Sequence, residues 1–379
     1  MKIEITDIST NGEGVGRIDG KVYFVPNALP GEIVEVEIIE DKGRFARARM
    51  VDDKPSCGGA PLLRYPYKLQ LEWKQKHVWE CLIKLAKLNQ PKVNTIIGMD
   101  NPYAYRNKCE FKIGAGLPYC NIDCTSCPLQ DEKTREIVQE FKDHPIKNAE
   151  EFIVRTTKTG EHMAFTVQSS GYILLYSGER VIHDYIDTDM GHLEVEVDPF
   201  SFYQVNATQT GILYSIAQKY AAPTADDTIL DLYCGCGTIG LSMADAAKRV
   251  IGVESEKSSI LLANRNAVIN RIVNAIFIQG KAEDVVKEKL QGVKADIVIL
   301  DPPRSGCKES LLKTVLEIGP KRIVYISCNP STLARDLDRI NQMSGAKGKA
   351  SYEFVEATPI DMFPHTAHVE TVVLMSKVK

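Results

Sequence analysis

The chain has 379 residues, of which 44% are hydrophobic and 25% are charged, a composition typical of folded globular proteins and not of disordered ones. This length indicates two or three domains. Its 46 basic and 50 acidic residues give a net charge of −4, which excludes a strongly basic protein, so any contact with nucleic acid must use a local patch.

Two further features bear on location. No apolar run approaches the roughly 18 residues that a membrane helix needs, so we expect no membrane partner. The N-terminal segment alternates apolar and polar residues and lacks the basic start and apolar core of a signal peptide. We therefore expect a cytoplasmic protein whose ten cysteines are reduced and available for metal binding, catalysis or packing. The sequence does not indicate the oligomeric state, and a monomer is our expectation.

Residues 1–50 are predicted to form a small β-barrel. Turn signals such as Asn11-Gly12 separate short strands of alternating polarity. The segment Lys42–Arg49 holds four basic residues around Phe45. A basic strand with an aromatic residue suits a nucleic-acid backbone, and a solvated edge strand is the alternative.

The rest of the chain shows two more patterns. Tyr67–Leu88 has apolar residues at helical spacing, and the region up to Val197 is rich in turns and short strands. After Asp198, strands alternate with helices, which indicates a parallel, doubly wound sheet. We therefore expect an α/β protein with a Rossmann-like domain, an N-terminal barrel and a central mixed α+β domain. The expected domains are the barrel over 1–50, the central domain over 51–68 and 101–197, and the Rossmann-like domain over 69–100 and 198–379.

The first turn of the doubly wound sheet has a glycine pattern typical of cofactor sites. Gly235-Cys236-Gly237-Thr238-Ile239-Gly240 follows the predicted strand Thr228–Tyr233, and Glu254 ends the next strand. The glycines let the backbone approach a ligand, and the acid can hold two ribose hydroxyls. This pattern alone does not distinguish NAD, FAD and S-adenosylmethionine, although the opening Asp231-Leu232-Tyr233 favours a methyltransferase.

Three later motifs stand at strand ends. Asp301-Pro302-Pro303-Arg304 follows a buried strand, and Cys328 lies between another strand and a helix N-terminus, where the helix dipole can activate a thiol. We interpret Cys328 as a nucleophile, and a buried structural cysteine is the alternative. Glu370 opens the last apolar strand, either as a solvated residue or as a functional acid.

The motifs SFYQVN, DLYCGCGTIG, GVE, DPPRSG, YISCNPSTLARDL and DMFPHTAHVET occur in this order. This set resembles the RNA uracil-5-methyltransferase family, in particular its bacterial 23S rRNA branch with an N-terminal TRAM domain. The resemblance implies S-adenosylmethionine-dependent methylation of uridine C5 in RNA, with rRNA favoured, through a covalent adduct between a cysteine and uracil C6. The alternatives are the same reaction on tRNA, a non-catalytic RNA-binding relic and an NAD-dependent oxidoreductase.

By position, the resemblance assigns roles to eight residues. Cys328 matches the nucleophile and Glu370 the general base. A thiolate that adds to uracil C6 makes C5 nucleophilic, and a base must then remove the C5 proton. The other matches are cofactor contacts at Gln204, Tyr233, Glu254 and Asp301 and substrate contacts at Phe202 and Arg304.

The cysteines depart from the family pattern. The family commonly holds an iron–sulfur cluster on four cysteines, but here Ala60 stands at one ligand position and no cysteine precedes Cys57. Only Cys57 and Cys127 match, so we expect no cluster of the family type. Cys120 and Cys124 lie close to Cys127 in sequence, and a rearranged four-thiolate iron–sulfur or zinc site with Cys57 is an open alternative.

Overall fold

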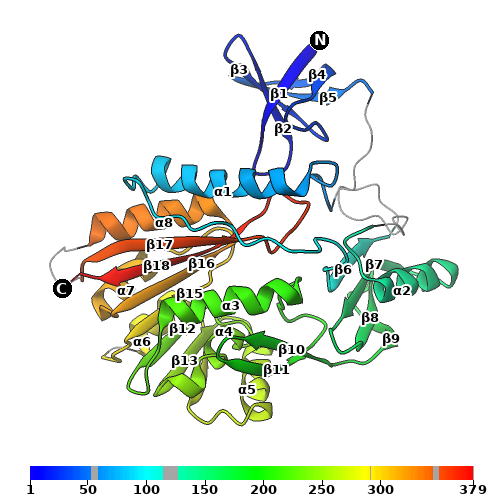
Figure 1. The fold of residues 1–379 in the computed structure, drawn as a ribbon. Coiled ribbons are helices and arrows are strands. Elements are labelled where there is room, and N and C mark those ends of the chain that lie inside the picture. Colours follow the sequence, from blue (N-terminus) through cyan, green and yellow to red (C-terminus); the bar gives the residue numbers. More distant parts are fainter. Residues whose placement is uncertain (53–58, 114–126, 291, 345–349, 379) are drawn as a thin grey trace.

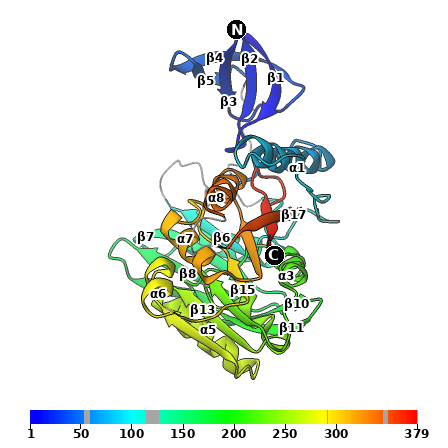
Figure 2. The same ribbon diagram turned by 90° about the vertical axis from the view of Figure 1, so that its left-hand side faces the viewer.

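The computed structural model describes residues 1–52, 59–113, 127–290, 292–344 and 350–378. These residues form a closed barrel, a four-stranded sheet, a two-stranded sheet and a seven-stranded sheet. The barrel stands apart at one end of the molecule, beyond the helix α1 (Tyr67–Lys84), in both orientations of the ribbon (Figures 1 and 2). Within the described ranges, no helix combines the length and the apolar character needed to cross a membrane.

The N-terminal barrel has the strand order β1-β2-β3-β5-β4, which confirms the predicted barrel. Ile3 and Ile5 in the first strand are buried, while their neighbours Glu4 and Thr6 are exposed, because successive side chains of a strand point to opposite faces. The barrel strands are β1 (Lys2–Ile8), β2 (Gly14–Ile18), β3 (Lys21–Val25), β4 (Ile33–Asp41) and β5 (Phe45–Met50).

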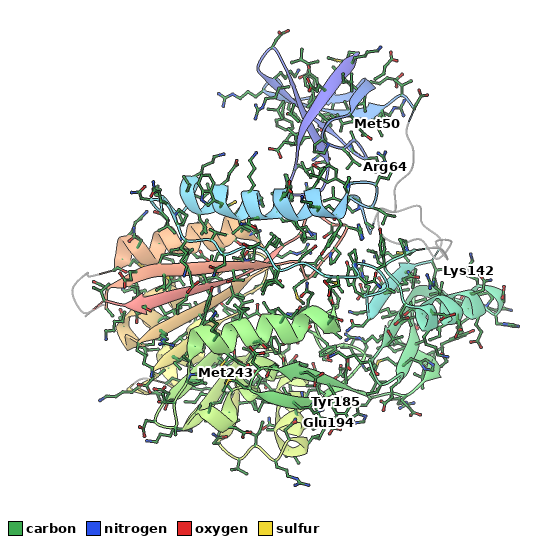
Figure 3. The ribbon with its side chains drawn as sticks, in the orientation of Figure 1. Met50, Arg64, Lys142, Tyr185, Glu194 and Met243 are labelled. Carbon is green, nitrogen blue, oxygen red and sulfur yellow. The ribbon has the colours of Figure 1, made fainter. Side chains whose placement is uncertain are left out.

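Helix α1 connects the barrel to the large sheet. Trp73 Nε1 donates a hydrogen bond of 2.8 Å to Asp7 Oδ1 in the barrel. Arg64 lies just before the helix (Figure 3) and forms an ion pair of 3.1 Å with Glu32. The other side of α1 packs against α8 (Pro330–Met343). These contacts support our proposal that residues 69–100 belong with 198–379. The helix is shorter than the predicted span to Leu88, since Lys87 adopts a left-handed backbone conformation.

The central part is an antiparallel sheet in the order β6-β7-β8-β9, covered on one face by α2. The rings of Phe141 in α2 and Phe152 in β7 stack at 3.9 Å, so apolar packing holds helix and sheet together. A separate hairpin, β10–β11, follows. The elements are β6 (Lys108–Lys112), α2 (Glu132–Asp143), β7 (Ala149–Thr156), β8 (His162–Gln168), β9 (Ile173–Gly178), β10 (Ile182–Thr188) and β11 (Gly191–Val197).

The large sheet has the order β14-β13-β12-β15-β16-β18-β17. Its first five strands are parallel, whereas β18 runs antiparallel to both β16 and β17. The central strands β15 and β16 are apolar runs because both of their faces are covered. The strands are β12 (Thr228–Leu232), β13 (Arg249–Glu254), β14 (Ala275–Gln279), β15 (Ile297–Leu300), β16 (Arg322–Ser327), β17 (Tyr352–Ile360) and β18 (Glu370–Lys377).

Helices cover both faces of the large sheet, which confirms the predicted Rossmann-like α/β fold. One buried cluster joins it to α1, α6, α7 and α8, and another joins it to α3, α4, α5 and the β10–β11 hairpin; α8 and α3 lie on opposite faces in Figure 1. The helix expected after the glycine turn has only four residues, since the chain between Gly237 and β13 is short. The remaining helices are α3 (Ala207–Ala221), α4 (Thr238–Leu241), the 3-10 turn Ala244–Ala246, α5 (Lys257–Ile269), α6 (Ala282–Glu288) and α7 (Glu309–Ile318).

Candidate active site

The carboxyl ends of four parallel strands meet at one edge of the large sheet. Leu232 in β12 pairs with Val253 in β13 and Leu300 in β15, and Leu300 pairs with Tyr325 in β16. The residues that end or follow these strands are therefore brought together at the edge where open α/β sheets bind ligands. They include Tyr233, Glu254, Asp301 and Cys328.

The antiparallel strand β18 brings Glu370 to the same edge. Ser327 at the end of β16 pairs with Thr371 in β18, so the next positions in this register are Cys328 and Glu370. The side chain of Glu370 is buried, with 3% of the residue exposed, and Cys328 is partly buried. A thiol and a carboxyl group, 42 residues apart in sequence, thus become neighbours through strand pairing.

The thiol of Cys328 is protonated at neutral pH in the free protein. Burial raises its pKa to about 11, and the nearby carboxyl of Glu370 adds to the increase, while the guanidinium of Arg304 opposes it. The dipole of α8, which the sequence suggested as an activator, therefore does not produce a low pKa here. Burial destabilises the charged thiolate by more than the helix N-terminus stabilises it.

The carboxyl groups of Asp301 and Glu370 form a second electrostatic unit. Burial raises the pKa of Asp301 to about 7. Burial, together with the charge of Asp301, also raises the pKa of Glu370 well above its usual value, and Arg304 opposes this increase. Two close carboxyl groups resist ionising together, so the pair releases its protons only near or above neutral pH.

Arg304 is held next to this unit by α8. Its backbone carbonyl accepts hydrogen bonds from Asn329 Nδ2 at 3.2 Å and from Thr332 Oγ1 at 3.1 Å. Its side chain is exposed, yet its charge acts on both Cys328 and Glu370. Arg304 therefore lies where it can contact a ring placed between thiol and carboxyl group.

The glycine turn leaves open space beside Glu254. A side chain at Gly235 would contact nothing within 4 Å, whereas one at Gly237 would meet the ring of Phe277 at 2.8 Å. The carboxylate of Glu254 accepts a hydrogen bond of 3.2 Å from the backbone N–H of Gly235. Gly235 thus offers its backbone to a ligand, while Gly237 provides close packing.

Asp231 is a residue of this edge to which sequence reasoning assigned no contact. Its Oδ2 accepts a hydrogen bond of 2.9 Å from the N–H of Gly240, and its buried Oδ1 has no hydrogen-bond partner among the described residues. Burial raises its pKa to about 7. An unpaired carboxylate oxygen next to the glycine turn can accept a hydrogen bond from a hydroxyl or ammonium group, and S-adenosylmethionine carries both.

The aromatic segment before α3 lies against the glycine turn. The Cys236 thiol donates to the carbonyl of Phe202 across 3.6 Å, and Asn107 Nδ2 donates to the carbonyl of Gln204 across 3.0 Å. Gln204 is buried, while 65% of Phe202 is exposed. An exposed ring held beside a site can stack on a base that has left its helix.

Comparison with known proteins identifies the family. A family model for tRNA (Uracil-5-)-methyltransferase matches residues 180–378, and a TRAM domain model matches residues 1–51. The chain belongs to the tRNA (uracil-5-)-methyltransferase family. It is therefore an RNA methyltransferase, and family membership removes the NAD-dependent oxidoreductase alternative.

Full-length relatives and a solved structure agree with this family. An RNA methyltransferase of Clostridium tetani, described as uncharacterized, is 33% identical over 98% of this chain and 95% of its own length. One of Bacillus cereus is 34% identical over 100% of this chain and 97% of its own. The structure of Pyrococcus abyssi tRNA (uracil-54, C5)-methyltransferase in complex with S-adenosyl-L-homocysteine is 26% identical, with a TM-score of 0.75 over 99% of this chain and 100% of that chain.

The TRAM barrel is not a strongly basic surface. Of the basic residues near Phe45, Arg47 pairs with Glu13 at 3.2 Å and Arg49 pairs with Glu37 at 2.9 Å. Lys42 pairs with Glu40 at 2.6 Å. These exposed pairs contribute little stability, and they neutralise part of the positive charge of this strand.

Most of the cysteines that could form a metal site lie outside the residues that the structure describes. Cys57, Cys120 and Cys124 are outside the described residues. Cys127 is buried and packs with Ala60 and Leu129, so the position where the family has a ligand is occupied here by an apolar side chain. The structure finds no group of three metal-binding side chains within the described ranges, and the rearranged thiolate site stays a prediction.

Two other residues of this edge were missed by sequence reasoning. Asp336 in α8 is fully buried and accepts hydrogen bonds from the N–H of Cys307 at 2.7 Å and the hydroxyl of Tyr325 at 2.8 Å, which fixes the loop that carries Arg304. His368 has a pKa lowered to about 4 by burial and by Arg304, so it is neutral near the site. Their motifs, LARDL and HTAHVE, were the available signals.

Proposed function

We propose that this protein methylates C5 of a uridine in RNA with S-adenosylmethionine as methyl donor, through a covalent bond between Cys328 and uracil C6. The observation that supports this most is the register of β16 and β18, which brings Cys328 and Glu370 together. Both groups lie at the edge that also carries the glycine turn, Glu254 and Asp301.

The proposed reaction assigns one task to each side chain. Cys328 transfers its proton to water, and its sulfur then bonds to C6 as the C5–C6 double bond opens, which places negative charge on C5 and O4 of the ring. When bound, S-adenosylmethionine would supply the methyl group to C5 and leave as S-adenosylhomocysteine. Glu370 then removes the C5 proton, the electron pair of that C–H bond re-forms the C5–C6 double bond, and the sulfur leaves C6. Arg304 stabilises the charge that develops between these groups.

The cofactor is held, in this proposal, by Glu254, Asp301, Gln204 and Tyr233. Support comes from the open space at Gly235 and from the Pyrococcus abyssi enzyme, whose structure contains S-adenosyl-L-homocysteine. Glu254 ends β13, where an acid holds the ribose hydroxyls in sites of this kind. Tyr233 has a left-handed backbone, which turns the chain into the glycine loop.

Replacement of Glu254 by Ala should weaken cofactor binding. The loss of a charged hydrogen bond costs about 1.5–3 kcal/mol, which corresponds to an increase in Kd of about ten- to a hundredfold. Calorimetric titration with S-adenosylhomocysteine measures this. Glu256→Ala, an exposed neighbour on the same loop, is the matched control and should bind as the wild type does. Equal affinities of the two variants would remove Glu254 from the cofactor site.

Turnover should increase with pH. Asp301, with a pKa of about 7, and the coupled Glu370 carry their proton at low pH, so the proton acceptor becomes available only as the pH rises. The raised pKa of Cys328 acts in the same direction, since more thiolate forms at higher pH. We expect single-turnover rates to rise between about pH 6 and about pH 9, measured with cofactor binding as the control. A profile that is flat or falls over this range would contradict these roles.

The proposal also names the class of RNA substrate. We favour rRNA, and tRNA is the second candidate, because the tRNA enzyme of Pyrococcus abyssi aligns over 99% of this chain. That alignment includes the barrel, so the barrel does not separate the two substrates. Membership of an RNA-modifying enzyme family is consistent with the expected cytoplasmic location. The presence of both Cys328 and Glu370 argues against a non-catalytic relic.

Mapping of 5-methyluridine in a deletion strain decides between the two RNA classes. If rRNA is the substrate, one or more uridines in rRNA lose the methyl group, and the purified protein restores it in vitro. Loss at a tRNA position alone would replace rRNA by tRNA as the substrate. No loss in either RNA would contradict the proposed function.

A further inference from the structure

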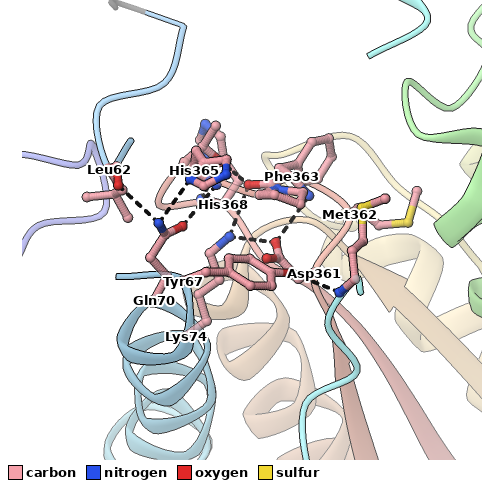
Figure 4. A network of polar contacts seen from close by, with 12 residues as sticks. Leu62, Tyr67, Gln70, Lys74, Asp361, Met362, Phe363, His365 and His368 are labelled. Carbon is pink, nitrogen blue, oxygen red and sulfur yellow. Dashed lines mark hydrogen bonds and ion pairs between the residues drawn. The ribbon is translucent and has the colours of Figure 1, made fainter. Parts of the chain in front are cut away.

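Two buried polar side chains of α1 reach the loop that leads to Glu370. Gln70 and Lys74 lie one helical turn apart, on the same face of the helix, and neither has any exposed surface. Both contact the segment Asp361–His365, which follows β17 (Figure 4). This segment begins the loop between β17 and β18, and Glu370 is the first residue after that loop.

Lys74 fixes the first part of the loop. Its Nζ forms an ion pair of 2.6 Å with Asp361 Oδ1, in which both side chains are fully buried, and it donates a second hydrogen bond of 3.0 Å to the carbonyl of Phe363. Asp361 Oδ2 is buried and has no hydrogen-bond partner in the described part of the chain. A buried pair of this kind is weak evidence for stability, because desolvation offsets its attraction. Its clear effect is geometric: it fixes Asp361 and Phe363 against α1.

Gln70 fixes the next part of the loop. Its Oε1 accepts a hydrogen bond of 2.9 Å from the N–H of His365, and its Nε2 lies 3.1 Å from His365 Nδ1 and donates to the carbonyl of Leu62 across 3.0 Å. The backbone of His365 is left-handed, with φ of 65°. Such a conformation costs a non-glycine residue about 1 kcal/mol or more and persists where its surroundings hold it. Gln70 supplies that restraint.

The fixed segment is directly connected to Glu370. Ile360, the residue before Asp361, pairs with Glu370 across β17 and β18. The N–H of Asp361 donates to the carbonyl of Ile97 across 2.8 Å, so the start of the loop is tied on a second side as well. A shift of Asp361 therefore moves the strand end against which Glu370 is placed.

We propose that Gln70 and Lys74 are positioning residues, which act through the Asp361–His365 segment to hold Glu370 where it removes the C5 proton. This inference rests on the proposed function, because it assumes that Glu370 is the general base. It assigns α1, which lies between the barrel and the large sheet, a role in the last step of the reaction. Methyl transfer itself needs Cys328 and the bound cofactor and does not depend on this network.

The test is the double variant Lys74→Met/Asp361→Leu. Apolar side chains of similar volume remove the ion pair and the hydrogen bond from Lys74 to Phe363 while preserving the fold, since such replacements of buried pairs are often neutral for stability. We expect the first methyl transfer at nearly the wild-type rate and an accumulation of covalent RNA–protein adduct. Removal of the C5 proton should slow by at least about tenfold, because misplacing a reacting group by about 1 Å can cost about a hundredfold. Rapid-quench samples on a denaturing gel with labelled RNA separate adduct from product.

Three further variants serve as controls for this experiment. Lys87→Met/Asp338→Leu removes an exposed ion pair of 3.1 Å between the end of α1 and α8 and should behave as the wild type does. Gln70→Ala should accumulate adduct in the same way, and it decides the question if thermal melting shows that the double variant is unfolded. Glu370→Gln on the same gel shows the band that the proposed function requires.

The outcomes separate the two proposals. A band with Glu370→Gln but wild-type resolution in folded Lys74→Met/Asp361→Leu and Gln70→Ala overturns the positioning role and leaves the proposed function intact. An equal loss of methyl transfer and of proton removal shows that the network only maintains the fold, which also overturns the positioning role. Absence of the band with Glu370→Gln contradicts the proposed function, and the inference fails with it.

Discussion

Replacement of Cys328 by Ala should abolish methyl transfer and leave cofactor binding nearly unchanged. In the proposed mechanism the thiol acts on the uracil ring, whereas the glycine turn, Glu254 and Asp301 hold the cofactor. Without addition at C6, C5 stays a weak nucleophile, and we expect turnover to fall by at least about 10⁴-fold, as in enzymes that lose their nucleophile. Filter binding of RNA methylated with a labelled methyl donor measures turnover, and calorimetry with S-adenosylhomocysteine measures binding.

A matched cysteine variant controls for the loss of a partly buried thiol. Cys81 in α1 is also buried, and its thiol contacts Ser331 in α8, but the proposed mechanism gives it no role. Cys81→Ala should keep wild-type turnover. Turnover near the wild-type level in Cys328→Ala would remove the covalent mechanism, whatever the effect on stability.

Replacement of Glu370 by Gln should trap the enzyme on its RNA. Gln preserves the shape of the buried side chain but cannot accept the C5 proton, so the sulfur cannot leave C6. Loss of a general base typically costs about 10²–10⁴-fold, and we expect the methylated adduct to accumulate to about one per enzyme. A denaturing gel with labelled RNA shows the adduct as a slowly migrating band.

An exposed glutamate of the same hairpin serves as the control. Glu353 in β17 pairs with Ser376 in β18 and faces solvent, so Glu353→Gln should turn over normally and show no band. If Glu370→Gln is folded and binds cofactor but forms no adduct, Glu370 is not the base that resolves it.

The sequence predicts the parallel sheet and its binding edge well. Buried strands such as Ile297–Leu300 are continuous apolar runs, and the candidate ligand-binding residues follow the strands at their carboxyl ends. The proximity of Cys328 and Glu370 does not follow from such local patterns. It depends on the insertion of β18 between β16 and β17, and only the resemblance to the family indicated it.

The network on α1 could not be predicted either. Gln70 and Lys74 lie among charged residues in a helix whose sequence reads as solvent-exposed at these positions, yet both are fully buried. The partner of Lys74 lies 287 residues away in sequence. The pKa of Cys328 is a similar case, because the helix N-terminus is visible in sequence while the burial that opposes it is a property of the folded chain.

The most direct test of the covalent mechanism uses RNA with 5-fluorouridine at the target position. Fluorine at C5 cannot be removed as a proton is, so the reaction should stop after methyl transfer with the RNA still bound to the enzyme. We predict that tandem mass spectrometry of the digested complex finds a nucleotide carrying both fluorine and the new methyl group on Cys328. A complex attached to another residue, or no covalent complex while unmodified RNA is methylated under the same conditions, would contradict the mechanism.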